Sequence, residues 1–266
     1  MENKTAKCVY CNKDFIKQYS SQKYCSIQCA NIKNNVARSK NVRLPKEFNA
    51  SLVEFMGILF GDGHVSKYFV KIYLNAVADR DYVPFVMELA KSLFHGASIT
   101  VRFNKKDSTN EIQISSIVVA NYLKKIGFNL PRQIPEWINH DIDFLKAFIR
   151  GLFDTEGSVG FKKFNGRNGK YLYKQLTFTS RNNNLLSFIP KNLANFRIKS
   201  TTTSRKNIYI SNSEDIKKFL MEIGLHNPKL IKKILIKNKE EYIVRLGRGP
   251  QWKGARAVES AALEMR

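Results

Sequence analysis

The stretch Phe55-Met56-Gly57-Ile58-Leu59-Phe60-Gly61-Asp62-Gly63 recurs 94 positions later as Ile149-Arg150-Gly151-Leu152-Phe153-Asp154-Thr155-Glu156-Gly157. Each copy is an apolar run that ends in a carboxylate and a glycine. On a helix, small residues spaced four apart form a stripe along which two backbones can approach closely. The predicted helix interface therefore consists of Gly57, Gly61, Gly151 and Thr155. If the helices pack there, Asp62 and Glu156 come together, and two close carboxylates need cations between them, which predicts a divalent metal site.

The repeat extends well beyond this motif. Ile112-Gln113-Ile114-Ser115 corresponds to Ile208-Tyr209-Ile210-Ser211, and Ile126-Gly127-Phe128 corresponds to Ile223-Gly224-Leu225. The offset drifts only from 94 to 97, so the chain contains two homologous halves. A lone Gly-Asp-Gly would more often be an ordinary turn. The recurrence favours a functional role for both copies.

Hydrophobic periodicity predicts helix, two strands, helix, two strands and helix in each half. The strand residues Val70, Ile72 and Leu74 are expected to face a core, as are Ile99, Val101 and Phe103. Leu176 and Phe178 are their expected counterparts in the second half. The fold class is therefore α+β, with two pseudo-symmetric αββαββα halves and antiparallel sheets. The predicted boundaries are 1–44 for an amino-terminal module and linker, 45–140 and 141–238 for the halves, and 239–266 for an extension to which we assign no function.

Over roughly residues 52–233 the chain resembles the LAGLIDADG homing endonucleases, in the single-chain form that carries two motifs. Fixed positions of the motif are matched by Gly57, Asp62 and Gly63 in the first copy and by Gly151, Asp154 and Gly157 in the second. Phe60 replaces the first acid of the motif in copy one, and Glu156 replaces its second acid in copy two. The resemblance implies that Asp62 and Glu156 are catalytic and bind Mg²⁺, since Glu is accepted there, and that Asp154 is structural.

The same resemblance implies a site-specific nuclease that cuts each strand of a long asymmetric DNA target once and leaves short 3′ overhangs. The alternative within the family is an intron splicing cofactor, or maturase, that binds RNA without nuclease activity. Retention of both acids favours the nuclease, because carboxylates beside phosphate weaken pure binding. A zinc-finger transcriptional regulator is the third interpretation, and it leaves the paired motif without a role.

Charge points to a polyanionic partner. Lys and Arg number 45 against 22 acids, which gives a net charge of +23 and a pI of about 9.9. The outward faces of twisted antiparallel ribbons can lie in the major groove of double-stranded DNA and read its bases. The alternative for each position is a merely solvated strand face. The predicted DNA contacts are Arg102, Gln113, Lys162, Arg167, Gln175, Arg181, Lys199 and Arg205.

All cysteines lie near the amino terminus, at Cys8, Cys11, Cys25 and Cys29. Their CxxC and CxxxC spacing suits a closed tetrahedral zinc site, which is structural because it leaves no open position. Two disulfides are the rival interpretation, but they belong to oxidising compartments. Residues 31–43 are expected to be a flexible basic connector, either one that follows a DNA groove or a solvated linker.

No apolar stretch approaches the length of a membrane span, and no charged-then-apolar leader opens the sequence. We therefore expect a monomer that is neither secreted nor membrane-bound, and that acts in the cytoplasm or nucleoid, or in an organelle matrix if an organelle encodes it.

Overall fold

The computed structural model describes residues 5–39, 41–128, 133–166, 169–204 and 206–235. The first half consists of α2 (Ala50–Asp62), β3 (Gly63–Val65), β4 (Val70–Asn75), the 3₁₀ turn η1 (Arg80–Tyr82), α3 (Val83–Leu93), β5 (Ser98–Asn104), β6 (Thr109–Ser115) and α4 (Ile117–Lys125). After η2 (Glu136–His140), the second half consists of α5 (Ile142–Glu156), β7 (Gly157–Gly166), β8 (Gly169–Thr179), α6 (Asn183–Leu193), η3 (Ala194–Phe196), β9 (Thr201–Ser204), β10 (Asn207–Ile210) and α7 (Ser213–Glu222). The predicted α+β class and the αββαββα order of both halves are confirmed.

Each half has one antiparallel four-stranded sheet, ordered β3-β4-β6-β5 in the first and β7-β8-β10-β9 in the second. The predicted alternation is confirmed in β4, where Val70, Ile72 and Leu74 are buried, and in β8, where Leu176 and Phe178 are buried. It is wrong for part of β5. Val101 and Phe103 are 37% and 57% exposed. Because β5 is the edge strand, it has a neighbour on one side only, and its far end is left uncovered.

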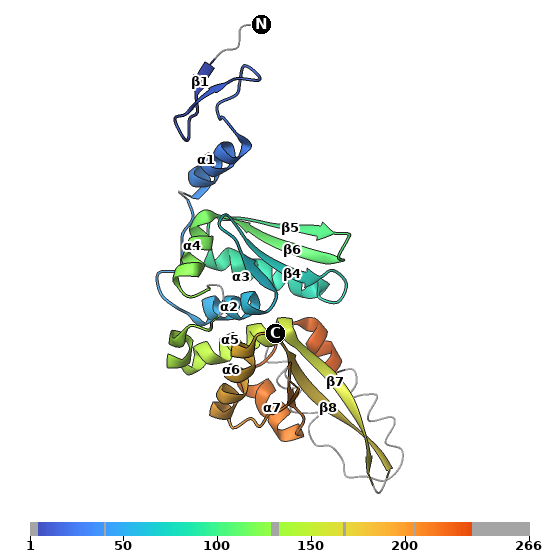
Figure 1. Cartoon of the computed structure of the whole chain (residues 1–266). Helices are drawn as coiled ribbons and strands as arrows, with labels where there is room; N and C mark the ends of the chain where they lie inside the picture. The colour runs from blue at the N-terminus through green and yellow to red at the C-terminus, as the bar shows by residue number, and fades with distance from the viewer. Residues whose placement is uncertain (1–4, 40, 129–132, 167–168, 205, 236–266) are drawn as a thin grey trace.

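Helices α2 and α5 lie side by side between the two halves (Figure 1). Residues 52–60 of α2 are all buried, since a helix with apolar side chains all around is stable only inside a core. Side-chain caps fix where both helices begin. The Asn49 side chain accepts a hydrogen bond from Leu52 N at 2.9 Å, and Asp141 accepts one from Asp143 N at 2.7 Å.

The amino-terminal module consists of the hairpin β1 (Thr5–Lys7) and β2 (Asp14–Ile16) and the helix α1 (Ile27–Ser39). It stands beyond the first half, on the side away from the second half (Figure 1). The expected flexible connector over residues 31–43 is therefore wrong for most of its length, because α1 continues through Ser39. The helix is rich in asparagine and cations, and over residues 31–43 only Ile32, Val36, Ala37 and Val42 are apolar, so the periodic signal there is weak.

The part of the chain that the structure describes contains no helix with both the length and the apolar character needed to cross a bilayer. The extension at 239–266 lies outside the described residues.

Candidate functional site

The two motif helices touch backbone to backbone. A Cβ placed on Gly57 would lie 2.3 Å from the carbonyl oxygen of Phe148, and one on Gly151 would lie 2.2 Å from the carbonyl oxygen of Glu54. A Cβ on Gly61 would lie 2.1 Å from Oγ1 of Thr155. Only hydrogen fits at these three glycines, so the small-residue stripes hold α2 and α5 in direct contact.

The two acids stand at the ends of these helices. Asp62 is the last residue of α2 and Glu156 the last residue of α5, and both side chains are partly exposed. Each helix turns directly into a strand at a glycine whose N–H caps it, donating from Gly63 to Leu59 and from Gly157 to Phe153.

The helix contact brings the side chain of Glu156 against the turn that carries Asp62. A Cβ placed on Gly61 would lie 3.1 Å from Cγ of Glu156, and Gly61 immediately precedes Asp62. Carboxylate oxygens of two side chains at adjoining helix ends are suitable ligands for Mg²⁺. Two pseudo-symmetric halves thus contribute one acid each to one end of their interface.

Polar faces of both sheets flank these helix ends. Gln113 lies on β6 and donates to Oγ of Ser115 at 2.8 Å, while Gln175 lies on β8 and donates to Oγ of Ser211 at 2.7 Å. Ser115 and Ser211 are equivalent in the repeat, so the two halves present the same amide-hydroxyl pair from different strands. In each strand the residues before and after the glutamine are buried, so both glutamine side chains project from the face away from the core.

The remaining predicted contacts are spread over both halves. Arg102 is exposed on β5 opposite Glu111, Lys162 is exposed on β7, and Arg181 and Lys199 are exposed next to β8 and β9. Arg167 and Arg205 lie outside the described residues. The structure brings the interface residues into contact and places the side chain of Glu156 beside Gly61, which precedes Asp62, whereas the described cationic positions lie on or next to different strands.

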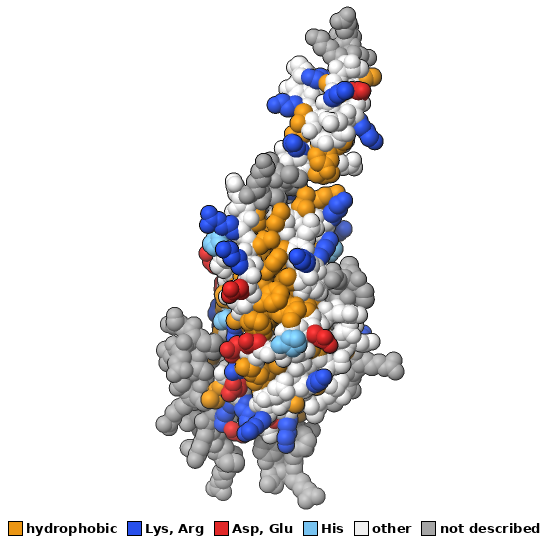
Figure 2. Space-filling model, turned by 90° about the vertical axis from the view of Figure 1, so that its left-hand side faces the viewer, with side chains coloured by type: hydrophobic (Ala, Val, Ile, Leu, Met, Phe, Trp, Pro, Cys, Tyr) orange, Lys and Arg blue, Asp and Glu red, His pale blue; other side chains and the backbone are white. Residues whose placement is uncertain are grey.

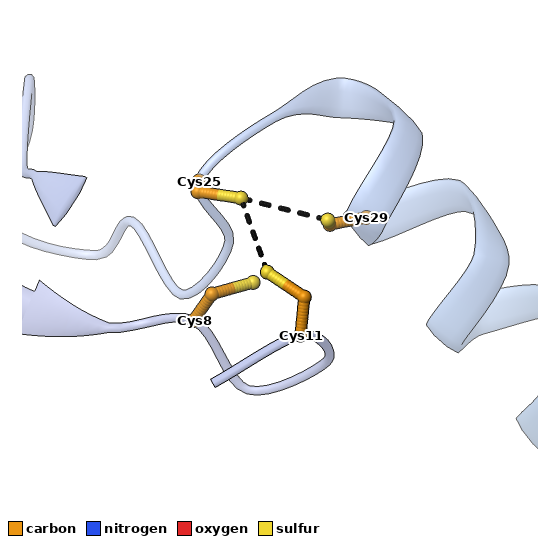
Figure 3. A group of neighbouring side chains, drawn as sticks. All are labelled: Cys8, Cys11, Cys25 and Cys29. Atoms are coloured by element: carbon orange, nitrogen blue, oxygen red, sulfur yellow. Dashed lines mark hydrogen bonds between the residues drawn. The ribbon is translucent and has the colours of Figure 1, made fainter. Parts of the chain in front are cut away.

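The cysteines converge as one cluster (Figure 3). Sγ of Cys25 lies 3.6 Å from Sγ of Cys11 and 3.5 Å from Sγ of Cys29, and all four sulfur atoms lie within 4.8 Å of one another. Zinc-sulfur bonds of about 2.3 Å in a tetrahedron separate the sulfurs by roughly 3.8 Å, so the cluster has the dimensions of a zinc site. Burial opposes ionisation of Cys8, but backbone hydrogen bonds from Cys11, Cys25 and Tyr10 lower its pKa to about 6.

Sequence reasoning missed a buried polar network beneath the acid pair. Glu54 of α2 is 4% exposed, and its carboxylate contacts Nη2 of Arg150 at 2.7 Å and Nδ1 of His226 at 2.5 Å. Burial opposes ionisation of Glu54, but His226 and Arg150 outweigh it and lower the pKa of this carboxyl. The one available signal was a charged residue inside each apolar motif helix, at Glu54 and Arg150.

Asp154 forms the second part of this network. Its carboxylate accepts the backbone N–H groups of His226 at 3.0 Å and Asn227 at 3.1 Å, and the hydroxyl of Tyr82 lies 3.4 Å away. The side chain of Asn227 donates to the backbone oxygen of Asp154 at 2.8 Å. Burial raises the pKa of the Asp154 carboxyl to about 7. Asp154 is 1% exposed and is structural, two residues before Glu156.

The fold and site define a class of protein: two homologous αββαββα halves joined through paired motif helices, each ending in an acid. A family model described as LAGLIDADG-like domain matches residues 143–224. The match covers less than half of the chain and shows that its second half is similar to a LAGLIDADG-like domain.

Curated relatives match over short parts of their own length. The Replication factor C small subunit of Methanocaldococcus jannaschii is 30% identical over 205 residues, which cover 73% of this chain and 10% of that protein. The DNA-directed RNA polymerase subunit Rpo1C of the same organism is 28% identical over 189 residues, covering 68% of this chain and 20% of the relative. The chain therefore spans only a tenth to a fifth of these relatives.

Similar solved structures include the homing endonuclease I-DmoI in complex with DNA and Mn, at 20% identity and a TM-score of 0.47, covering 66% of this chain and 98% of that one. The LAGLIDADG meganuclease I-AabMI bound to uncleaved DNA is 12% identical with a TM-score of 0.48, covering 81% of this chain and 97% of that one.

Proposed function

We propose that this protein is a site-specific DNA endonuclease that hydrolyses phosphodiester bonds with Mg²⁺ and makes a double-strand break at a long asymmetric target. The observation that supports the proposal is that Asp62 and Glu156 are the last residues of two packed helices, and that a Cβ on Gly61, next to Asp62, would lie 3.1 Å from Cγ of Glu156. The backbone N–H groups of Gly63 and Gly157 cap the two helices, so neither acid acts as the C-cap of its own helix. Two nearby carboxylates repel each other, so their placement at adjoining helix ends is better explained by metal binding than by a contribution to stability.

Asp62 and Glu156 would hold Mg²⁺ together with oxygens of the scissile phosphates. Bound there, Mg²⁺ lowers the pKa of a water and stabilises the departing 3′ oxygen. The helix contact through Gly57, Gly61 and Gly151 sets the spacing of the two acids, and no side chain has to act as the nucleophile.

The polar faces of the two sheets would hold the duplex across the acids. Gln113 and Gln175 present amide groups that can both donate to and accept from base edges. Arg102, Lys162, Arg181 and Lys199 would contact phosphates, which gives affinity without sequence information. Different side chains at equivalent strand positions, such as Gln113 and Tyr209, make the two half-sites unlike, and therefore the target asymmetric.

The proposal is tested by selecting cleaved duplexes from a randomised library in the presence of Mg²⁺. We expect one long asymmetric sequence to be enriched and cut on both strands. Asp62→Asn and Glu156→Gln should each abolish cutting while they keep or strengthen binding. The matched control Glu47→Gln removes an exposed acid before α2 and should cut like the unaltered protein. High affinity for structured RNA with no cutting of any duplex would instead identify a splicing cofactor.

We also propose that Cys8, Cys11, Cys25 and Cys29 bind one structural Zn²⁺, as the sulfur separations support. A closed set of four sulfurs contributes to folding and leaves no place for a substrate. Metal content per chain, measured by emission spectrometry, should be one zinc. Disulfide-linked chains without zinc would refute this assignment.

The curated relatives carry names of unrelated activity, replication and transcription, and share only a short segment with this chain. The shared segment covers 73% and 68% of this chain, so most of this chain corresponds to a unit that two differently named proteins contain. We propose that it is an independent unit that acts on DNA by itself, in keeping with an endonuclease.

A further inference from the structure

A hollow of about 320 Å³ lies between the amino-terminal helix and the first sheet. Gln28, Asn31 and Ile32 of α1 line one side of it, and Tyr68, Phe69 and Gln113 line the other. Gln28, Asn31 and Ile32 share one helix face because they are spaced three and four residues apart. We call this feature the α1 hollow.

The α1 hollow opens on the polar face of the sheet. Gln113 stands between Ile112 and Ile114, which are both fully buried, so its side chain projects from the opposite face. This is the face on which the endonuclease proposal places DNA. Helix α1 therefore lies at the end of the first half, where it contacts α4 and also lines a hollow with Gln113 of the polar sheet face.

The hollow also lies at the end of the sheet that points away from the acids. Strand β3 starts at Gly63, directly after Asp62, and leads to the loop at 66–69 that contributes Tyr68 and Phe69. At ~3.3 Å per residue, this loop begins about 10 Å from the helix end. In Figure 1 the module continues the line that runs through the second half and the first half. A duplex that lies across both sheets runs along that line and would pass the module.

The module has the chemistry of a nucleic-acid contact. Its described residues include Lys7, Lys13, Lys17, Lys23 and Lys33, against the single acid Asp14. Figure 2 shows several Lys and Arg side chains on the visible face of the module. With four thiolates and one Zn²⁺ counted, the described module is still net positive. Amides and aromatic rings in the hollow suit base edges and sugars, while the lysines suit phosphates.

We propose that α1 and the cysteine module form a third DNA contact, which binds the duplex flank outside the half-site of the first sheet through the α1 hollow. This rests on the proposed endonuclease function and specifies its substrate further. Helix α1 has 13 residues and is about 20 Å long, so the added contact spans roughly six base pairs. The full site is therefore longer on the side of the first half.

The test is a hydroxyl-radical footprint of the full chain on its selected target, with Ca²⁺ replacing Mg²⁺ so that the duplex is bound uncut. The unaltered protein should protect roughly six more base pairs on one flank than on the other. Gln28→Ala combined with Asn31→Ala should lose protection on that flank only. These two side chains are exposed, so the fold and the zinc content should be unchanged. The matched control Asn183→Ala removes an exposed amide from α6 and should leave the footprint intact.

Affinity measurements complete the test. Removing the outer base pairs of that flank from the duplex should weaken binding of the unaltered protein by about tenfold, as loss of one good amide-base contact does. The same shortening of the duplex should not weaken the binding of the double variant that carries Gln28→Ala and Asn31→Ala. Equal protection of both flanks, or a variant footprint identical to that of the unaltered protein, would overturn the proposal. Mg²⁺-dependent cutting with equal flanks would still leave the endonuclease function standing, whereas absence of any DNA binding would refute both.

Discussion

Replacing Gly57 with alanine tests the helix contact on which the acid pair depends. The new Cβ would lie 2.3 Å from the carbonyl oxygen of Phe148 and 2.9 Å from the backbone nitrogen of Leu152. Both atoms belong to the backbone of α5, so no side chain can rotate away. The helices must separate by about 1 Å to reach an ordinary contact distance, which is overpacking of the kind that costs about 1–3 kcal/mol.

The sign of this change is what makes it informative. In a helix without such a contact, Gly→Ala stabilises by about 1 kcal/mol, because alanine has the higher helix propensity. We expect Gly57→Ala to destabilise by about 2 kcal/mol, and to lower Tm by roughly 4–8 °C for a protein of this size. Gly160→Ala is the control, since its nearest neighbour is the Gln175 oxygen at 4.0 Å.

Urea and thermal unfolding followed by circular dichroism measure both variants. Separation of the helices also moves Asp62 away from Glu156, so cleavage by Gly57→Ala should slow more than binding weakens. A Gly57→Ala protein as stable as the unaltered chain, or more stable, would refute the close contact of α2 and α5.

Three further predictions concern the buried network and the cysteine cluster. The pKa of Asp154 rises from 3.8 to about 7 on folding, because burial favours the protonated carboxyl. The contribution of this group to the free energy of unfolding is therefore largest below about pH 4 and is lost as the pH rises to about 7. Asp154→Asn should remove this fall of the free energy of unfolding with pH in urea unfolding measured between about pH 5 and 7.5. Arg150→Met leaves the buried Glu54 carboxylate without its arginine partner and should cost about 3–5 kcal/mol, part of which Glu54→Gln in the same chain should restore in the same assay. Cys25→Ser or Cys29→Ser should lower zinc content below one per chain in emission spectrometry, while Mg²⁺-dependent cutting of a duplex without the outer flank continues, and loss of that cutting would count against a separate module.

The parts of the fold that sequence predicts are those with a local signal. The buried residues of β4 alternate with exposed or partly exposed ones in strict period two, and the motif helices are dense in apolar residues around the charges Glu54 and Arg150. Edge strand β5 shows the same alternation, yet Phe103 is exposed, because period two cannot say whether a helix covers the strand end. Helix α1 carries its apolar residues between asparagines and cations, which leaves a weak periodic signal.

The buried network escaped prediction for a different reason. Glu54 and Arg150 are 96 positions apart, and Glu54 and His226 are 172 apart, so only the folded packing pairs them. A charge inside an apolar helix shows that a partner exists but not where it lies. The acids Asp62 and Glu156 could be singled out because the repeat marks both positions, and their role in cleavage stays a prediction.

The pairing of Glu54 with Arg150 also gives the two halves an orientation toward each other. By the repeat, the position of Arg150 is held by Met56 in the first half, and the position of Glu54 is held by Phe148 in the second. If two copies of the first half met each other across chains, each Glu54 would be buried against methionine with no cation. Two copies of the second half would place the half-buried Arg150 against phenylalanine without a carboxylate partner, with only its hydrogen bond to the Ile223 carbonyl left. Either pairing of like halves would leave a charged side chain in the interface without an oppositely charged partner, which costs free energy. Each half therefore pairs preferentially with the other half of its own chain.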